Sequence, residues 1–118
     1  MIWGGAEKRR FVRANFPCKI AIHIPSRHTL STHTENIGVG GIRVIIGEKS
    51  EIFSTVGLEI FLGEEPIICN GRVVWVVENK SNYQEDFFSY DTGMEFVDIK
   101  EEDRAAIKNF VEAIVLSK

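Results

Sequence analysis

The chain has 118 residues, of which 44% are hydrophobic and 26% charged, with 14 Lys and Arg against 17 Asp and Glu. This composition is typical of one soluble globular domain, and the net charge of −3 argues against binding to DNA or RNA, which usually requires a basic face. No apolar run approaches the ~20 residues of a membrane span, and a signal peptide is not evident. Two cysteines are too few for a disulfide framework. We therefore expect a cytoplasmic protein that does not insert into a membrane.

The first feature in chain order is a basic cluster, in which four cations occupy the six positions from Lys8 to Arg13. Arginine presents a planar fork of donors that can bind a phosphate, or the acceptor edge of guanine, with two hydrogen bonds. Gly4 and Gly5 precede the cluster, so residues 1–15 are predicted to form a flexible arm that could fold over a ligand. Taken alone, the cluster is explained slightly better by a solvated basic turn.

Residues 16–98 show the period-two alternation and the turn signals of a β protein. Strands are expected at 18–24, 31–36, 42–46, 58–62, 67–77 and 88–96, separated by a turn at 25–28 and loops at 47–54 and 78–86. The polar run 31–36 is typical of an edge strand or a ligand-facing strand. The run 67–77 is apolar on both parities, which predicts a central strand buried on both faces at its end. Trp75 and Phe96 are interpreted as core residues.

The cluster of Gly38, Gly40 and Gly41 allows positive φ and a close backbone approach, as a tight turn or a phosphate-binding loop requires. From residue 99 to 118 the period becomes helical, with one apolar stripe and an acidic first turn that suits the helix dipole. Short strands that meander in this way must close or pack to hide their edges. We therefore predict a mostly β fold, a small antiparallel barrel of about six strands with a C-terminal helix packed on it.

Four motifs, taken together and in order, resemble the PilZ domain, a bacterial receptor domain for cyclic di-GMP. They are Arg-x-x-x-Arg at residues 9–13, Asn-x-Gly-x-x-Gly at 36–41, Gly-Arg-Val-Val-Trp-Val at 71–76, and Tyr-Asp-Thr-Gly-Met-Glu-Phe at 90–96 followed by Asp103-Arg104. Each motif alone is weak, but the resemblance covers nearly the whole chain. It implies a single PilZ-like domain over 1–118, with the arm at 1–15, the barrel at 16–98 and the helix at 99–118.

The resemblance also implies a ligand site. Arg9 and Arg13 would bind the phosphates and guanines of cyclic di-GMP, and Asn36 would offer its amide to a guanine edge. Gly41 would let the loop turn tightly beneath the ligand. Lys8 occupies the position that bears on how many ligands the family holds, and Arg10 is either a ligand contact or a solvated charge.

Gly38 departs from the family pattern, which has a serine at this position. The missing hydroxyl would remove a hydrogen bond to a charged group, worth roughly 1.5–3 kcal/mol, so affinity would fall by about ten- to a hundredfold. We expect weakened rather than abolished binding, because the arginines remain.

Three functions stay open at this point. The chain could be a receptor in which cyclic di-GMP reshapes the arm and the surface signals to an unidentified protein partner. It could be a degenerate PilZ domain, an adaptor that binds proteins without a nucleotide. A distant third option is a small barrel that binds single-stranded nucleic acid by aromatic stacking.

We find no catalytic constellation in the sequence and expect neither an enzyme nor a cofactor. His23, His28 and His33 are evenly spaced, but that spacing in strands and turns does not bring them together, so a metal site is not predicted. Cys18 and Cys69 both fall within strand patterns and are interpreted as small buried hydrophobic residues.

Overall fold

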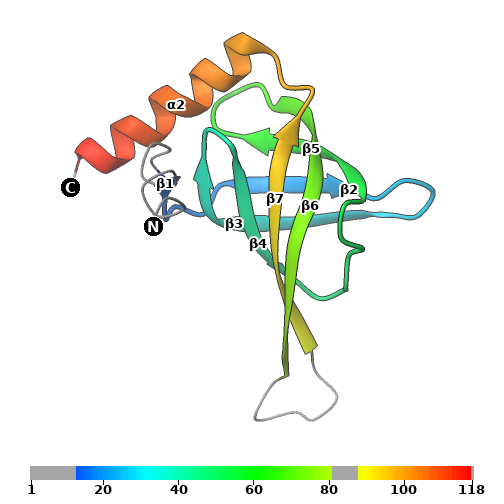
Figure 1. Cartoon of the computed structure of the whole chain (residues 1–118). Helices are drawn as coiled ribbons and strands as arrows, with labels where there is room; N and C mark the ends of the chain where they lie inside the picture. The colour runs from blue at the N-terminus through cyan, green and yellow to red at the C-terminus, as the bar shows by residue number, and fades with distance from the viewer. Residues whose placement is uncertain (1–12, 81–87, 118) are drawn as a thin grey trace, which may run out of the picture.

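The computed structural model describes residues 13–80 and 88–117 (Figure 1). Lys8, Arg9 and Arg10 lie outside these ranges, as does most of the predicted arm. The described part contains seven strands and one helix. They are β1 (Arg13–Ala14), β2 (Lys19–His23), β3 (Thr29–Gly38), β4 (Gly41–Ile46), β5 (Thr55–Phe61), β6 (Ile67–Lys80), β7 (Phe88–Val97) and α2 (Glu101–Leu116).

Six of the strands form a closed barrel in which every neighbouring pair is antiparallel. The hydrogen-bonded order is β3-β2-β5-β6-β7-β4, and pairing of β3 with β4 closes the ring. β1 adds two residues to the free side of β3, where Arg13 lies opposite Gly38. The predicted barrel and its C-terminal helix are confirmed. Residues 31–36 are not an edge, because β3 pairs with β2 over Thr29–His33 and with β4 from Thr34 onward.

The core follows from the alternation of apolar residues in each strand, as predicted for β2, β4 and β5. Ile20 and Ile60 are opposite each other on neighbouring strands, and both are fully buried. Phe96 is also buried, as predicted. The prediction that the end of the 67–77 run is buried on both faces is wrong: Val77 is 52% exposed, and only one face of β6 contacts the core.

A β-bulge in β6 explains why the interpretation of Trp75 as a core residue is also wrong. Val73 pairs with Met94 and Trp75 with Gly93, so Val74 is an extra residue without a partner in β7. A bulge of this kind reverses the face on which the following side chains lie. Val73 is fully buried, whereas Trp75 is 39% exposed on the outside of the barrel.

A second bulge lies in β3 and acts in the same way. Thr34 pairs with Val44 and Asn36 with Arg43, which leaves Glu35 as the extra residue. Strict alternation would have placed Asn36 on the inner face beside Thr34. The bulge instead places Asn36 on the outer face, and Ile37 fills the core.

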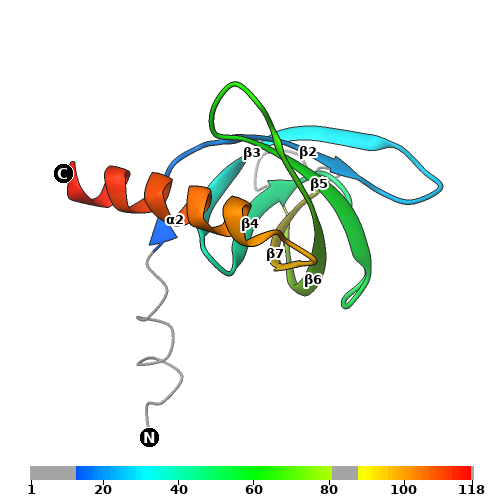
Figure 2. The same ribbon diagram turned by 90° about the horizontal axis from the view of Figure 1, so that it is seen from above.

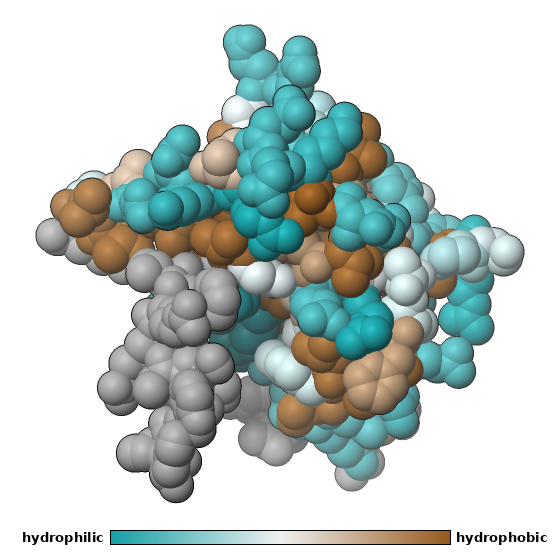
Figure 3. Space-filling model, turned by 45° about the horizontal axis from the view of Figure 1, so that its top comes forward, coloured by the Kyte–Doolittle hydropathy of each residue, from teal (hydrophilic) through white to brown (hydrophobic). Residues whose placement is uncertain are grey.

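Helix α2 crosses one end of the barrel and packs on β1 and β3 (Figures 1 and 2). Ile107 and Val111 are buried, and the ring of Phe110 meets Phe16 edge to face at 5.6 Å between centroids. The predicted apolar stripe runs from Ile107 to Val115, and its buried part is shorter than predicted, because Val115 is 40% exposed. The last turn of the helix accordingly shows hydrophobic surface at the left of Figure 3. No helix in the described ranges is long and apolar enough to cross a membrane.

Thr34 fixes the segment between β1 and β2 to the barrel. Its hydroxyl accepts a hydrogen bond from the backbone N–H of Cys18 at 3.0 Å and donates one to the carbonyl of Phe16 at 2.9 Å. The backbone N–H of Thr34 also donates to the Cys18 carbonyl at 2.9 Å. Because Thr34 is only 2% exposed, water cannot easily replace these bonds.

We expect Thr34→Val to lower the free energy of unfolding by about 1–3 kcal/mol. The shape of the side chain is kept, but the Cys18 N–H loses a side-chain acceptor and the Phe16 carbonyl loses its donor in a buried place. Urea unfolding followed by circular dichroism measures the loss. Thr55→Val on β5 is the matched control, because Thr55 is exposed, and it should change stability by less than about 0.5 kcal/mol. Equal effects of the two substitutions would contradict this role for Thr34.

Candidate functional site

A cavity of about 360 Å³ lies on the outer face of the barrel, over β4, β7 and β6. Its lining consists of Arg13, Asn36, Gly40, Gly41, Ile42, Arg43, Val74, Trp75, Gly93, Met94 and Glu95. The size is within the ordinary range of small-molecule sites, roughly 300–1,000 Å³. Both bulges contribute to it, since one turns Asn36 toward the cavity and the other turns Trp75.

Two glycines form the floor. Gly41 lies opposite Glu95 in the β4–β7 pairing, and Gly93 lies between Arg43 and Trp75 on the neighbouring strands. A Cβ atom on Gly93 would come within 2.2 Å of the Trp75 ring, so the indole lies directly over this glycine. The indole can lie this close to β7 because Gly93 carries no side chain.

Gly41 serves close packing rather than an unusual backbone conformation. No glycine in the described ranges has a positive φ, so Gly38, Gly40 and Gly41 do not use that freedom, whereas the expected close backbone approach is confirmed at Gly41. A Cβ atom on Gly41 would lie 2.0 Å from the carbonyl oxygen of Met94. The residue must therefore be glycine for β4 to approach β7 this closely.

Arg13 lies at the mouth of the cavity and is bound to Asn36. Its Nε and Nη2 atoms both donate to Asn36 Oδ1, at 2.9 and 2.6 Å, and Nη2 also reaches the Gly41 carbonyl at 3.3 Å. Partial burial lowers the pKa of Arg13 from its ordinary value, but a guanidinium stays charged at neutral pH. Asn36 Oδ1 already accepts two hydrogen bonds from Arg13. The amide NH₂ of Asn36 is therefore the group left to contact a ligand, to which it can donate.

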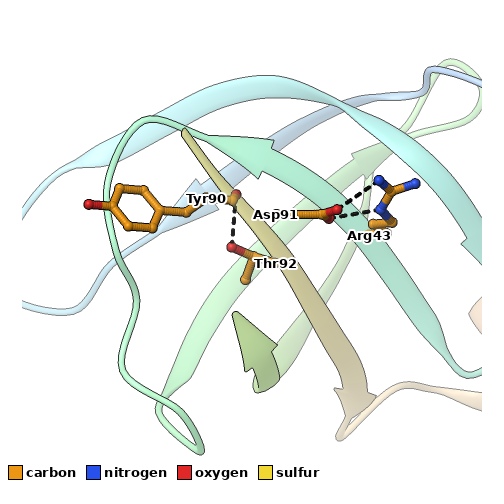
Figure 4. A network of polar contacts seen from close by, with 4 residues as sticks. All are labelled: Arg43, Tyr90, Asp91 and Thr92. Carbon is orange, nitrogen blue, oxygen red and sulfur yellow. Dashed lines mark hydrogen bonds and ion pairs between the residues drawn. The ribbon is translucent and has the colours of Figure 1, made fainter. Parts of the chain in front are cut away.

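Arg43 provides a second cation in the lining and is fixed by Asp91 (Figure 4). Nε and Nη2 donate to the two carboxylate oxygens at 2.8 and 2.7 Å, a bidentate ion pair across the β4–β7 ladder. The hydrogen bonds that Asp91 accepts from Arg43, and its negative charge, raise the pKa of Arg43. On the other side of β7, the Tyr90 ring points away from Arg43. The backbone carbonyl of Tyr90 accepts a 3.2 Å hydrogen bond from the Thr92 hydroxyl.

The structure brings three of the predicted site residues together, namely Arg13, Asn36 and Gly41. Gly38 is buried and pairs with Arg13 in the β1–β3 ladder, but it does not line the cavity. The predictions for Lys8, Arg9 and Arg10 fall outside the described residues.

Among the lining residues with charged or aromatic side chains, sequence reasoning missed Arg43, Trp75 and Glu95. Arg43 could have been found from its position two residues after Gly41, which places it on the same face of β4. Glu95 lies two residues after Gly93 and so faces the same side of β7. No local signal marks the bulge that turns Trp75 outward.

The remaining candidates do not form a second chemical site in the described ranges. His23 contacts Thr29 and Glu59 while His28 contacts Glu48, and no group of histidine, cysteine and carboxylate side chains there could hold a metal ion. Cys18 and Cys69 are both buried, as predicted. Burial raises the pKa of Cys69 to about 11, so its thiol stays protonated at neutral pH and is a poor nucleophile.

The fold and the cavity define a class: a small closed β-barrel with a C-terminal helix and a cavity on its outer face that is lined by two arginines. The model of the PilZ domain family matches residues 7–113. The chain therefore belongs to the PilZ domain family. No curated protein matches it by sequence.

Solved structures of three proteins share this fold. The Bacillus subtilis inhibitor of motility MotI/DgrA has a TM-score of 0.76 at 22% identity, over 93% of this chain and 52% of that chain. The PilZ domain with c-di-GMP of YcgR from Escherichia coli has a TM-score of 0.72 at 11% identity, over 93% of both chains. The K. pneumonia MrkH–c-di-GMP complex has a TM-score of 0.74 at 13% identity, over 92% of this chain and 53% of that chain. The chain thus spans about half the length of MotI/DgrA and of MrkH, and at these identities the likeness is one of fold.

We expect Gly41→Ala to lower the free energy of unfolding by about 1–3 kcal/mol, because the added methyl group must push β4 away from the Met94 carbonyl. Thermal unfolding followed by circular dichroism measures the effect. Gly40→Ala is the matched control, since a Cβ atom there meets no atom within 4 Å. A Gly41→Ala variant as stable as Gly40→Ala would refute the close-packing role.

Proposed function

We propose that this chain is a receptor domain for cyclic di-GMP, which it binds in the cavity lined by Arg13 and Asn36. One observation carries the proposal: Arg13 and Asn36 come from two separate motifs, 23 positions apart, and their side chains meet at the mouth of one cavity. The occurrence of c-di-GMP in the YcgR and MrkH structures of the same fold supports this choice of ligand.

The chemistry of the lining suits this ligand. Cyclic di-GMP carries two phosphates and two guanines, and a guanidinium can donate two hydrogen bonds to a phosphate or to O6 and N7 of guanine. Arg13 supplies one such group, and the family resemblance adds Arg9, with Lys8 and Arg10 raising the local positive potential. The NH₂ of Asn36 can donate to a guanine edge, and the exposed Trp75 ring offers a face on which a base can stack.

Ligand binding would act on the N-terminal arm. Arg13 and Ala14, the described part of the predicted arm besides Asn15, are already paired with β3, so the part of the arm that precedes β1 would close over the bound nucleotide. The new surface would contact a partner protein in the cytoplasm. Such a response requires that the ligand bind the closed arrangement more tightly than the open one. In this proposal the chain is a receptor and not an enzyme, and cyclic di-GMP is its ligand rather than a cofactor.

Arg13→Ala should weaken cyclic di-GMP binding by about ten- to a hundredfold, because it removes hydrogen bonds from a charged donor. Isothermal titration calorimetry measures the change, and Arg9→Ala with Arg13→Ala should abolish the signal. Arg27→Ala is the matched control, since it removes the same charge from an exposed turn outside the cavity. If Arg27→Ala and Arg13→Ala weaken binding equally, general electrostatics accounts for the effect and the assigned site is wrong.

The adaptor function stays as the second candidate because Gly38 replaces the serine of the family pattern. A folded wild-type protein that gives no heat at high cyclic di-GMP concentration would favour the adaptor. The receptor would then be excluded, and only the barrel would be shared with the nucleotide-binding relatives.

Gly38→Ser should tighten cyclic di-GMP binding by about tenfold, since it restores a hydroxyl on the same face of β3 as Asn36. Gly47→Ser is the control, because residue 47 is exposed, lies outside the cavity, and a Cβ atom there meets no atom within 4 Å. Circular dichroism establishes that both variants are folded. Unchanged or weaker binding by a folded Gly38→Ser variant would show that the glycine is not what limits affinity.

A further inference from the structure

Glu95 is the carboxylate among the described residues that line the cavity. It lies on the outer face of β7, between Gly41 on β4 and Arg72 on β6. Its side chain is 41% exposed, so a ligand in the cavity can reach it. An acidic group beside Arg13 and Arg43 is unexpected in a site for a doubly negative ligand, because its charge opposes binding of the phosphates.

The carboxylate is held in place from behind by two further residues. Nη2 of Arg72 lies 2.8 Å from Glu95 Oε2. The Arg72 guanidinium lies over the Phe53 ring, with its Cζ atom 5.5 Å from the ring centroid. Phe53 itself is fixed by a 2.6 Å hydrogen bond from its N–H to the Val73 carbonyl. Arg72 therefore positions the Glu95 carboxylate and is itself held by Phe53. Because Arg72 does not line the cavity, it balances the charge of Glu95 from outside the cavity.

The contact between Phe53 and Arg72 is kept although the conformation of Phe53 is unfavourable. Its φ is 71°, in the left-handed region that is unfavourable for an aromatic residue, and it is 67% exposed. A strained backbone and an exposed aromatic ring both oppose stability, so their occurrence beside Arg72 suggests a functional constraint.

A carboxylate can only accept hydrogen bonds, whereas the two lining arginines can only donate them. The Watson–Crick edge of guanine presents two adjacent donors, N1–H and N2–H, which match the two oxygens of a carboxylate. The same edge of adenine presents the N1 acceptor and a single amino group. Glu95 therefore has a favourable partner in guanine and an unfavourable one in adenine.

We propose that Glu95 accepts hydrogen bonds from N1–H and N2–H of a guanine base and so selects cyclic di-GMP over cyclic di-AMP. Arg72 is its positioning residue. The inference rests on the proposed function, and it assigns base selectivity to a residue outside the arginine and asparagine motifs.

The test is calorimetric titration of the wild type, Glu95→Gln and Glu64→Gln with cyclic di-GMP and with cyclic di-AMP. The two possible roles of Glu95 predict changes of opposite sign. If Glu95 reads guanine, Glu95→Gln weakens cyclic di-GMP binding by about tenfold or more and narrows the preference over cyclic di-AMP. If Glu95 is only a nearby negative charge, its removal tightens binding of both nucleotides. Glu64→Gln removes the same charge from an exposed turn and should change neither affinity.

The outcomes separate this inference from the function on which it depends. A wild-type protein that binds cyclic di-GMP, together with a Glu95→Gln variant that binds it equally or more tightly, overturns the role of Glu95 and leaves the receptor standing. Equal affinity of the wild type for the two nucleotides also overturns it. A wild-type protein that binds neither nucleotide overturns both. Thermal unfolding of each variant establishes that the comparison is made between folded proteins.

Discussion

The functional face of this barrel depends on two single-residue insertions into its hydrogen-bond ladders. Glu35 interrupts the pairing of β3 with β4, and Val74 interrupts the pairing of β6 with β7. Each insertion keeps the preceding residue in the core while turning the next functional side chain outward. Without them Asn36 and Trp75 would face the interior, and the cavity would lose a polar group and its aromatic wall.

The charges around the cavity are arranged in separate pairs rather than in one positive field. Arg43 is matched by Asp91, and Glu95 by Arg72. Arg13 instead contacts neutral acceptors, the amide oxygen of Asn36 and the carbonyl of Gly41. Of these three arginines, Arg13 is thus the one without a carboxylate partner in the described part of the chain, which suits a group that is to meet an anionic ligand.

Much of the fold could be predicted from the sequence because the barrel strands alternate outside the two bulges and the helix carries a clear apolar stripe. The prediction succeeded for Ile20, Ile60 and Phe96, whose burial follows directly from parity. It failed for Trp75 because one extra residue reverses parity without any local mark. The cavity floor could not be predicted either, because the role of Gly93 depends on which residues of β4 and β6 lie beside it. Those neighbours are set by the pairing register between segments that are distant in the sequence.

The pairing of β1 with β3 differs in kind from the rest of the sheet. It joins only two residues on each side, Arg13 with Gly38 and Ala14 with Ile37, and it lies outside the closed ring. A backbone hydrogen bond contributes roughly 0.5–1.5 kcal/mol net to stability. A ladder as short as this one therefore contributes little stability by itself. Within the closed ring, by contrast, each of the six strands pairs with a neighbour on both sides. Within the described chain, β1 is therefore held by packing more than by its ladder, since Ala14 is buried and helix α2 packs on β1. The path of the chain at Arg13 thus depends on the C-terminal helix as well as on β3.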